Sequence, residues 1–227
     1  MKKYSYIGVA FIILIFGIYA IPEIVNRLKN NDIIKSNNKV EKIRKLDSIS
    51  KLIIINKVPS FEFLNQDGQL ISNSFYDNKV YVVEFFFTTC PTICPKMTES
   101  MVTIQNEFYA HQDFGIVSFS INPTHDTPEI LKQYAKDHGA TLKNWNFLTG
   151  EQDKIYELAN NGFTLYAGEN SDAEGGFEHS GMFALIDKQG NIRSRLDKLG
   201  NPIAFYDGLD PKGVEMIKED IAILLKE

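Results

Sequence analysis

The run Val80–Phe87, followed closely by Cys90-Pro-Thr-Ile-Cys94-Pro, constrains the fold more than any other part of the sequence. The run is apolar except for Glu84, and continuous apolarity predicts a strand buried on both faces of an α/β sheet. Pro95 is typical of the first turn of a helix. Both thiols are therefore expected at the C-terminal end of a central strand, where open α/β sheets carry their functional groups.

The elements that follow alternate between strands and helices. The sequence predicts a buried strand at Ile116–Ile121, a helix that begins at Thr127-Pro128, a hairpin of Met182–Asp187 with Ile192–Leu196, and a final amphipathic helix at Pro211–Lys226. This order, with a dithiol at the first strand-to-helix turn, predicts an α/β domain with a thioredoxin-like fold, in which helices flank a central mixed sheet.

The N-terminus has the character of a membrane anchor. Residues 4–22 contain no charged side chain, and as a helix of about 1.5 Å per residue they match the thickness of a bilayer core. No Ala-x-Ala cleavage site follows, which favours an uncleaved signal-anchor over a cleaved signal peptide. We expect a transmembrane anchor at residues 1–22, a basic tether at 23–57 and the folded domain at 58–227.

Charge separates the tether from the domain. The tether carries nine basic and four acidic residues, a net charge of +5, whereas the domain carries thirteen basic and twenty-five acidic residues, a net charge of −12. An acidic domain argues against nucleic-acid binding. The basic tether is suited to anionic lipid head groups, although a merely solvated linker has the same composition.

Cys90 and Cys94 are the only cysteines in the chain. Exposed backbone amides at a helix N-terminus lower the pKa of a thiol, so we expect Cys94 to be the thiolate. Three residues separate the two, one more than in the redox Cys-x-x-Cys motif, and the wider loop suits two sulfurs on one metal ion. Two thiolates with a third, imidazole ligand would suit copper.

Four histidines are available as that third ligand. His111 and His138 fall near predicted helix ends, where they cap carbonyl groups in solvent, and His125 lies in a polar, solvent-facing turn. His179 ends a loop rich in glycine and acidic residues and precedes the strand at Met182. By spacing alone, metal binding is one of several roles open to His179.

Taken together, these segments resemble the Sco/SenC family of copper proteins. The resemblance covers about residues 58–226 in consistent order. It rests on Cys90-Pro-Thr-Ile-Cys94-Pro after the apolar strand, Asp126-Thr127-Pro128-Glu129, His179-Ser180, Leu185-Ile186-Asp187-Lys188-Gln189-Gly190 and Tyr206-Asp207-Gly208.

The resemblance implies a thioredoxin-like domain, anchored by the N-terminal helix, that faces the periplasm at the outer side of the inner membrane. It implies that copper is bound by Cys90, Cys94 and His179. The expected role is a chaperone that delivers copper to, or prepares the thiols of, the dinuclear copper site in subunit II of cytochrome c oxidase. Two segments depart from the family pattern: Asn122-Pro123, where an aspartate is common, and Arg195–Ala204, which lengthens the connection before Tyr206.

Three alternatives use the same cysteines differently. A thiol–disulfide reductase acting on cysteines of an exported partner would need neither histidine nor metal. A thiol peroxidase commonly has threonine three residues before its reactive cysteine, where this chain has Phe87. A structural disulfide would close so short a loop that it would stabilise the fold little.

Overall fold

The computed structural model describes Phe16, Gly17 and residues 52–227. The chain divides into two compact units, Met1–Ser48 and Ile49–Glu227, and all predicted site residues lie in the second. The expected anchor at 1–22 and most of the expected tether lie outside the described residues. Among the residues that are described, no helix is long and apolar enough to cross a membrane.

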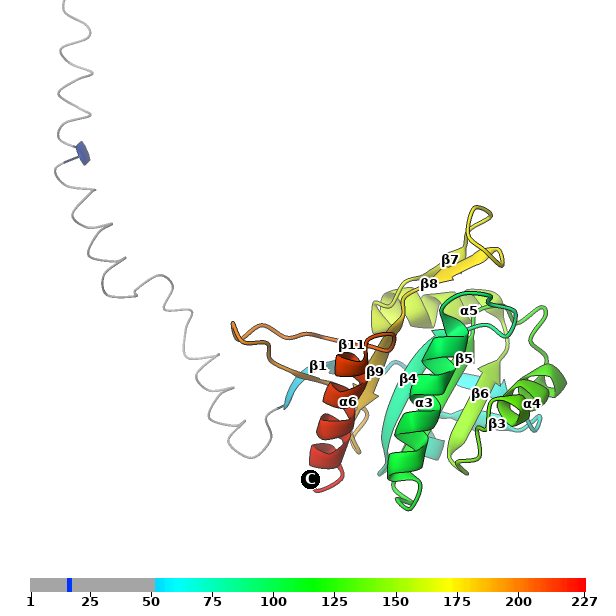
Figure 1. The fold of residues 1–227 in the computed structure, drawn as a ribbon, viewed down its shortest axis with the longest axis horizontal. Helices are drawn as coiled ribbons and strands as arrows, with labels where there is room; N and C mark the ends of the chain where they lie inside the picture. Colours follow the sequence, from blue (N-terminus) through cyan, green and yellow to red (C-terminus); the bar gives the residue numbers. More distant parts are fainter. Residues whose placement is uncertain (1–15, 18–51) are drawn as a thin grey trace, which may run out of the picture. The chain divides into compact units, whose positions relative to one another are not determined.

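A nine-stranded mixed sheet forms the centre of the domain, as expected (Figure 1). Its order is β1-β10-β9-β4-β5-β6-β2-β3, and β11 pairs with β9. Strand β4 is parallel to β5 and antiparallel to β9, and all seven of its residues are buried, which confirms the predicted central strand. The strands are β1 (Leu52–Lys57), β2 (Glu62–Asn65), β3 (Leu70–Ser72), β4 (Val80–Phe86), β5 (Phe114–Ser120), β6 (Trp145–Thr149), β9 (Met182–Ile186), β10 (Asn191–Arg195) and β11 (Tyr206–Asp207).

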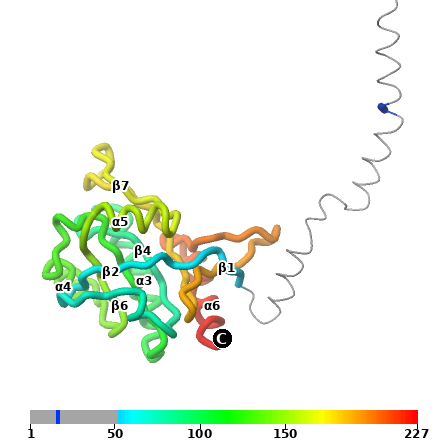
Figure 2. The backbone as a smooth tube through the Cα atoms, turned by 180° about the vertical axis from the view of Figure 1, so that it is seen from behind, coloured from blue at the N-terminus to red at the C-terminus, as the bar shows by residue number. Residues whose placement is uncertain are grey.

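Helices cover both faces of this sheet (Figures 1 and 2). The ring of Tyr134 packs on Phe86, whereas the ring of Phe163 packs on Phe85. Neighbouring residues of a strand point to opposite faces, so these two contacts lie on opposite sides of β4. The helices are 3-10 helix η1 (Asn73–Tyr76), α3 (Cys94–Phe108), α4 (Pro128–Asp137), α5 (Gln152–Glu157), π-helix η2 (Leu158–Phe163) and α6 (Pro211–Leu224).

The helix starts follow from local sequence. Each of α3, α4 and α6 has a proline in its first turn, where a missing N–H costs no hydrogen bond. The side chains of Thr127 and Asp210 accept hydrogen bonds from the first turns of α4 and α6, as N-cap residues do. The predicted start of α4 at Thr127-Pro128 is therefore confirmed.

The folded domain begins earlier than its expected boundary at residue 58. Leu52–Lys57, which we assigned to the tether, form strand β1 and pair antiparallel with β10. Leu52 is buried, and its neighbours Ile53, Ile54 and Ile55 are β-branched residues suited to a strand. The apolar end of the tether thus completes one edge of the sheet.

The pairing directions bring four segments to one end of the sheet. Strand β4 runs antiparallel to β9, β9 runs antiparallel to β10, and β10 runs antiparallel to β1. The C-terminal ends of β4 and β10 therefore lie at the same end as the first residues of β9 and β1. We call this the dithiol end, because the cysteine loop follows β4 there.

Candidate metal centre

The cysteine loop joins the end of β4 to the first turn of α3. A turn closes at its start, where the amide of Cys90 donates to the carbonyl of Phe87 at 3.3 Å. At its end the amide of Cys94 points to Cys90 Sγ at 3.5 Å. Both cysteines are free thiols and both are buried, with 7 % and 1 % of their surfaces exposed.

His179 reaches this loop from a separate two-stranded sheet. It is the last residue of β8 (Phe177–His179), which pairs antiparallel with β7 (Ala167–Glu169). Its Nε2 lies 3.0 Å from Cys94 Sγ. Its Nδ1 lies 3.1 Å from the carbonyl oxygen of Ser180, an arrangement in which Nδ1–H donates and Nε2 keeps its lone pair for the thiol side.

The ligand atoms of Cys90, Cys94 and His179 all lie within 4.8 Å of one another. All three side chains are buried. Among the described residues this is the one such group of three or more histidine, cysteine or acidic side chains. The structure therefore brings together the three residues that the resemblance implied, and they can surround one soft metal ion.

The two thiols differ in acidity, in the opposite sense to our expectation. A hydrogen bond from Cys94, assisted by its backbone amide, lowers the pKa of the Cys90 thiol well below its usual range. The same hydrogen bond, together with burial, raises the pKa of Cys94. The expectation that Cys94 is the thiolate is wrong because its amide at the start of α3 points to Cys90 Sγ. These contacts favour the thiolate at Cys90 over the thiolate at Cys94.

The buried carboxylate of Asp126 holds the start of the cysteine loop in place. Asp126, which is fully buried, accepts hydrogen bonds from the amide of Thr88 at 3.0 Å and from the hydroxyls of Thr88 and Ser120. Thr88 lies two residues before Cys90, so Asp126 ties the start of the loop to the end of β5. The Asp126-Thr127-Pro128 motif is part of the family resemblance, but no local pattern indicates that the carboxylate faces the loop.

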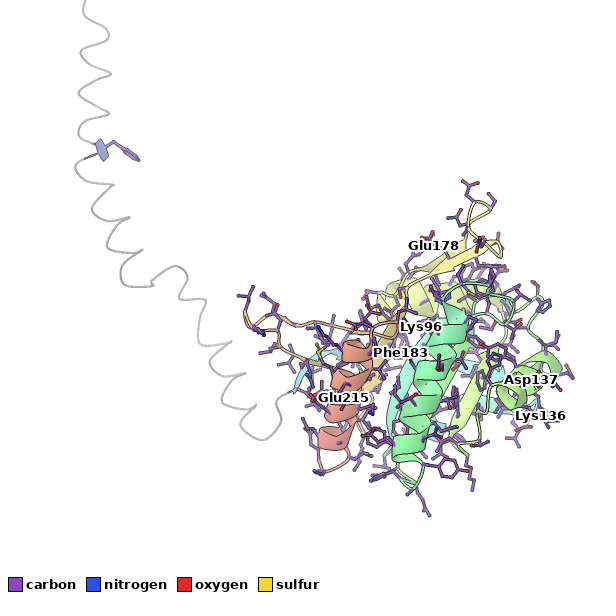
Figure 3. The ribbon with its side chains drawn as sticks, in the orientation of Figure 1. Lys96, Lys136, Asp137, Glu178, Phe183 and Glu215 are labelled. Carbon is purple, nitrogen blue, oxygen red and sulfur yellow. The ribbon has the colours of Figure 1, made fainter. Side chains whose placement is uncertain are left out.

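Aromatic side chains cover the other side of the centre. The ring of Phe87 lies 5.9 Å from that of His179, edge to face, and 5.3 Å from that of Phe177. Gly175, with φ +86°, lies so close that an added Cβ would be 2.9 Å from the Phe87 ring and 3.3 Å from Pro91. The β7–β8 hairpin therefore packs directly on the cysteine loop; Figure 3 labels Glu178 on this hairpin and Lys96 in the first turn of α3.

The other three histidines lie outside the cluster. His138 Nδ1 is 2.9 Å from the carbonyl oxygen of Tyr134, which agrees with the predicted capping role. The His111 side chain is 50 % exposed beside Asp113. The His125 side chain is 47 % exposed, as expected for a polar turn, but its Nδ1 also lies 2.8 Å from buried Asp126. The sequence did not indicate this last contact.

Asn122, where the family often has aspartate, closes the turn that presents Asp126. Its backbone carbonyl accepts from the amide of Asp126 at 2.9 Å, and its side-chain oxygen accepts from Thr124. The side chain is part of a buried turn rather than a free acid at the dithiol end.

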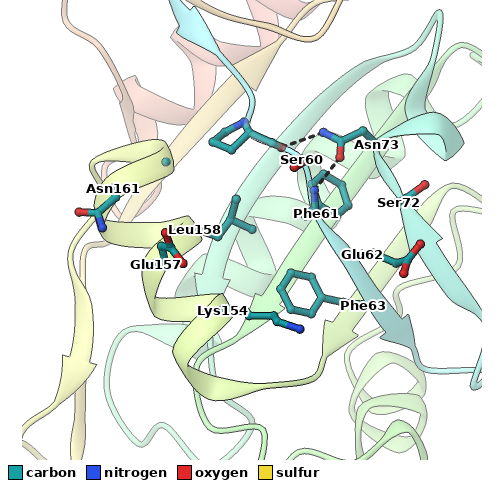
Figure 4. A pocket seen from close by; sticks show the side chains of 12 residues that line it. Ser60, Phe61, Glu62, Phe63, Ser72, Asn73, Lys154, Glu157, Leu158 and Asn161 are labelled. Atoms are coloured by element: carbon teal, nitrogen blue, oxygen red, sulfur yellow. Dashed lines mark hydrogen bonds between the residues drawn. The ribbon is translucent and has the colours of Figure 1, made fainter.

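A separate groove of the described residues lies away from the metal centre. It has a volume of about 890 Å³ and runs between β2 and the helices α5 and η2 (Figure 4). Phe61, Phe63 and Leu158 line its apolar part, and Glu157 and Lys154 line its rim. None of the three clustered ligands lines it, so the dithiol chemistry is separate from this groove.

Comparison with known proteins agrees with the geometry. The family model described as SCO1/SenC matches residues 55–210. The chain belongs to the SCO1/SenC family. It is 36 % identical over 138 residues to a SCO1 protein homolog of Bacillus subtilis, which covers 60 % of this chain and 71 % of that protein.

Solved structures of SCO1/SenC proteins share the fold. A SCO1/SenC family lipoprotein from Bacillus anthracis is 30 % identical, with a TM-score of 0.67, covering 78 % of this chain and 99 % of that one. BsSco, described with a disulfide switch and as a member of the Sco family of cytochrome c oxidase assembly proteins, is 30 % identical, with a TM-score of 0.64 and coverages of 77 % and 96 %. Yeast Sco1 with copper bound is 22 % identical, with a TM-score of 0.56 and coverages of 74 % and 90 %, and shares the fold. The thioredoxin-like α/β fold and the family resemblance are thus confirmed.

Proposed function

We propose that this protein is a membrane-anchored copper chaperone that holds one copper ion between Cys90, Cys94 and His179. The observation that carries the proposal is the convergence of two sulfurs and one imidazole nitrogen within 4.8 Å in a buried site. Thiolates are soft ligands that suit Cu(I) and zinc, and imidazole suits both metals. The copper-bound structure of yeast Sco1, which shares this fold, supports the choice.

Copper is the cargo in this proposal. Metal binding requires Cys94 to lose its proton, because only the thiolate is a strong ligand. Any proton held on either sulfur therefore leaves when copper arrives. The recipient is the dinuclear copper site in subunit II of cytochrome c oxidase, supported by the description of BsSco as an oxidase assembly protein. The domain would act on the periplasmic face of the inner membrane, held there by residues 1–22.

The test is an anaerobic titration of the reduced full-length protein with Cu(I) against a competing chelator. We expect one tightly bound copper in wild type. In His179→Ala the Cu(I) affinity should fall by more than the roughly 10–100-fold that removal of an outer-shell partner costs. His138→Ala is the matched control, since His138 is exposed at the end of α4 and should leave the affinity unchanged. Undiminished affinity in His179→Ala would rule out this ligand set.

A thiol–disulfide reductase is the second candidate, and the unequal acidity of the two thiols favours it. A low-pKa thiolate at Cys90 beside a protonated Cys94 is the arrangement that attacks a disulfide and then resolves the mixed disulfide. Reductase activity that persists in His179→Ala, with no stoichiometric copper in wild type, would support this function instead.

A further inference from the structure

The connection Leu196–Ala204 forms an arm that projects from the sheet at the dithiol end (Figures 1 and 2). It continues β10 past Arg195 and returns toward β11 through a bridge between Leu196 and Pro202. At its tip, Leu199 is 86 % exposed, the largest exposed fraction among the large apolar side chains of the described residues.

The arm holds this tip in a fixed turn. One carboxylate oxygen of Asp197 accepts from the amides of Leu199 and Asn201, each at 2.8 Å. The amide of Asp197 donates to the carbonyl of Asn201 at 2.7 Å, and Gly200 adopts φ +86°, which favours glycine. These bonds to the ionised carboxylate lower the pKa of Asp197. A hydrogen-bonded turn thus holds the Leu199 side chain in solvent.

Further exposed apolar side chains lie at the base of the arm and on the neighbouring edge strand. Leu196 is 37 % exposed, and Ile54 and Ile55 of β1 are 60 % and 37 % exposed. Lys198, next to Leu199 in the chain, is exposed, and no ion pair within residues 52–227 involves it. Exposed leucine and isoleucine next to an unpaired lysine are the combination that binds the interface of an anionic membrane.

The position of the arm in the fold also favours a membrane as the partner of this surface. Leu52, where the chain enters the domain from the tether, pairs with Arg195 at the base of the arm. The preceding 51 residues include the uncharged segment 4–22 and residues 23–51 of the tether, which carry a net charge of +4. If residues 4–22 are held in a bilayer, the chain therefore leaves the folded domain beside the base of the arm.

We propose that the arm tip, Lys198-Leu199, with Leu196 and the exposed isoleucines of β1, is a lipid-binding surface that rests on the membrane interface. The inference rests on the membrane anchoring in the proposed function. The contact turns the dithiol end toward the bilayer, because the cysteine loop and the arm leave the same end of the sheet. The domain would then no longer rotate freely, and copper would be held near the membrane surface.

The test places a tryptophan at the tip of the full-length protein. Leu199→Trp is reconstituted in vesicles of phosphatidylcholine and phosphatidylglycerol, with and without brominated phosphatidylcholine. Tyr109→Trp is the control, since Tyr109 is 54 % exposed at the far end of α3. Trp145, the single native tryptophan, is buried and gives the same background in both variants.

We expect the Leu199→Trp emission to shift to the blue in vesicles and to be quenched by brominated lipid, while Tyr109→Trp shows neither effect. Lys198→Gln in the Leu199→Trp background should weaken the response in vesicles that contain phosphatidylglycerol. Equal quenching of the two tryptophans would overturn the proposal. The emission of Leu199→Trp is also measured without vesicles. A blue shift there, at higher protein concentration or on addition of the soluble domain of oxidase subunit II, would overturn the proposal in favour of a protein partner.

Flotation of the same vesicles tests the membrane anchor separately from the lipid contact of the arm. If the protein floats with lipid and Leu199→Trp stays unquenched, the anchor holds and the arm proposal fails. If the protein does not float, the anchoring in the proposed function fails.

Discussion

Two of the buried aspartates, Asp187 and Asp126, lie at opposite ends of the sheet, and the partners of their carboxylates differ. Asp187, 3 % exposed at the β9–β10 turn, accepts from the amides of Gln189 and Asn191 and from Arg193 Nη1 at 2.9 Å. Asp126, fully buried at the dithiol end, accepts from the backbone and hydroxyl of Thr88 and contacts no arginine or lysine among the described residues.

The difference shows that burial of an acid does not by itself mark a functional site. The charge of Asp187 is matched by a guanidinium that is itself buried, so the turn is closed and structural. The carboxylate of Asp126 is held by the amide and hydroxyl of Thr88, by the hydroxyl of Ser120 and by His125 Nδ1. Of these, Thr88 belongs to the loop that carries the thiols. The partner of a buried carboxylate therefore indicates its role better than its burial does.

Replacing Asp187 should have the largest effect on stability. Asp187→Ala removes the buried partner of Arg193, and breaking such a pair costs about 3–5 kcal/mol. Urea unfolding of the reduced protein measures this loss. Cu(I) affinity should stay unchanged, because the turn lies at the end of the sheet away from the cysteines. A parallel drop in copper affinity would show that the two ends are energetically coupled.

Glu84, in the middle of β4, is a further buried acid. Ser118 donates to one carboxylate oxygen at 2.7 Å, while the other oxygen has no hydrogen-bond partner among the described residues. Burial raises the pKa of Glu84 to about 7. The folded protein therefore keeps a proton that the unfolded chain loses near pH 4.5, and stability should fall as pH rises from about 4.5 to 7.

The size of this pH effect is about 3 kcal/mol, from a pKa raised from 4.5 to about 7. Glu84→Gln keeps the shape and the neutral state of the carboxyl, so its stability should depend less on pH over that window. Thermal or urea unfolding at pH 5 and pH 8 checks the prediction. Identical pH profiles for wild type and Glu84→Gln would show that Glu84 does not titrate in this range.

Asp126→Asn should have the smallest effect on stability and the clearest effect on copper. Loss of the carboxylate weakens the hold on Thr88, and outer-shell changes of this kind lower metal affinity about 10–100-fold. The Cu(I) competition titration measures this, with Asp187→Ala as the control for nonspecific destabilisation. Wild-type affinity in Asp126→Asn would place the carboxylate among purely structural residues, like Asp187.

The sequence predicted the elements with strong periodicity and the residues with distinctive chemistry. The apolar run before the cysteines identified β4, and Thr127-Pro128 identified the start of α4, because both signals are local. The start of the sheet at Leu52 was missed, since the pairing of β1 with β10 joins segments nearly 140 residues apart in the chain, a separation that no local pattern reports.

The candidate site shows the same limit. His179 approaches Cys94 through the separate β7–β8 hairpin. Its place after a glycine-rich loop distinguished it from the other histidines, and the family resemblance implied its ligand role. The acidity of the two thiols was assigned the wrong way round because helix position alone does not reveal where an amide points. The contact of Asp126 with Thr88 depends on two strand ends that meet in space, and the sequence did not indicate it.

The pair of cysteines has a consequence for how the chain folds when oxidised. Because Cys90 and Cys94 are its only cysteines, one molecule can form a single intramolecular disulfide, with no isomers of connectivity to sort. Oxidised refolding therefore has no scrambled products within the chain and no need for disulfide isomerisation. Any additional sulfur bond that appears must join this protein to another molecule, which makes non-reducing electrophoresis a direct count of its covalent partners.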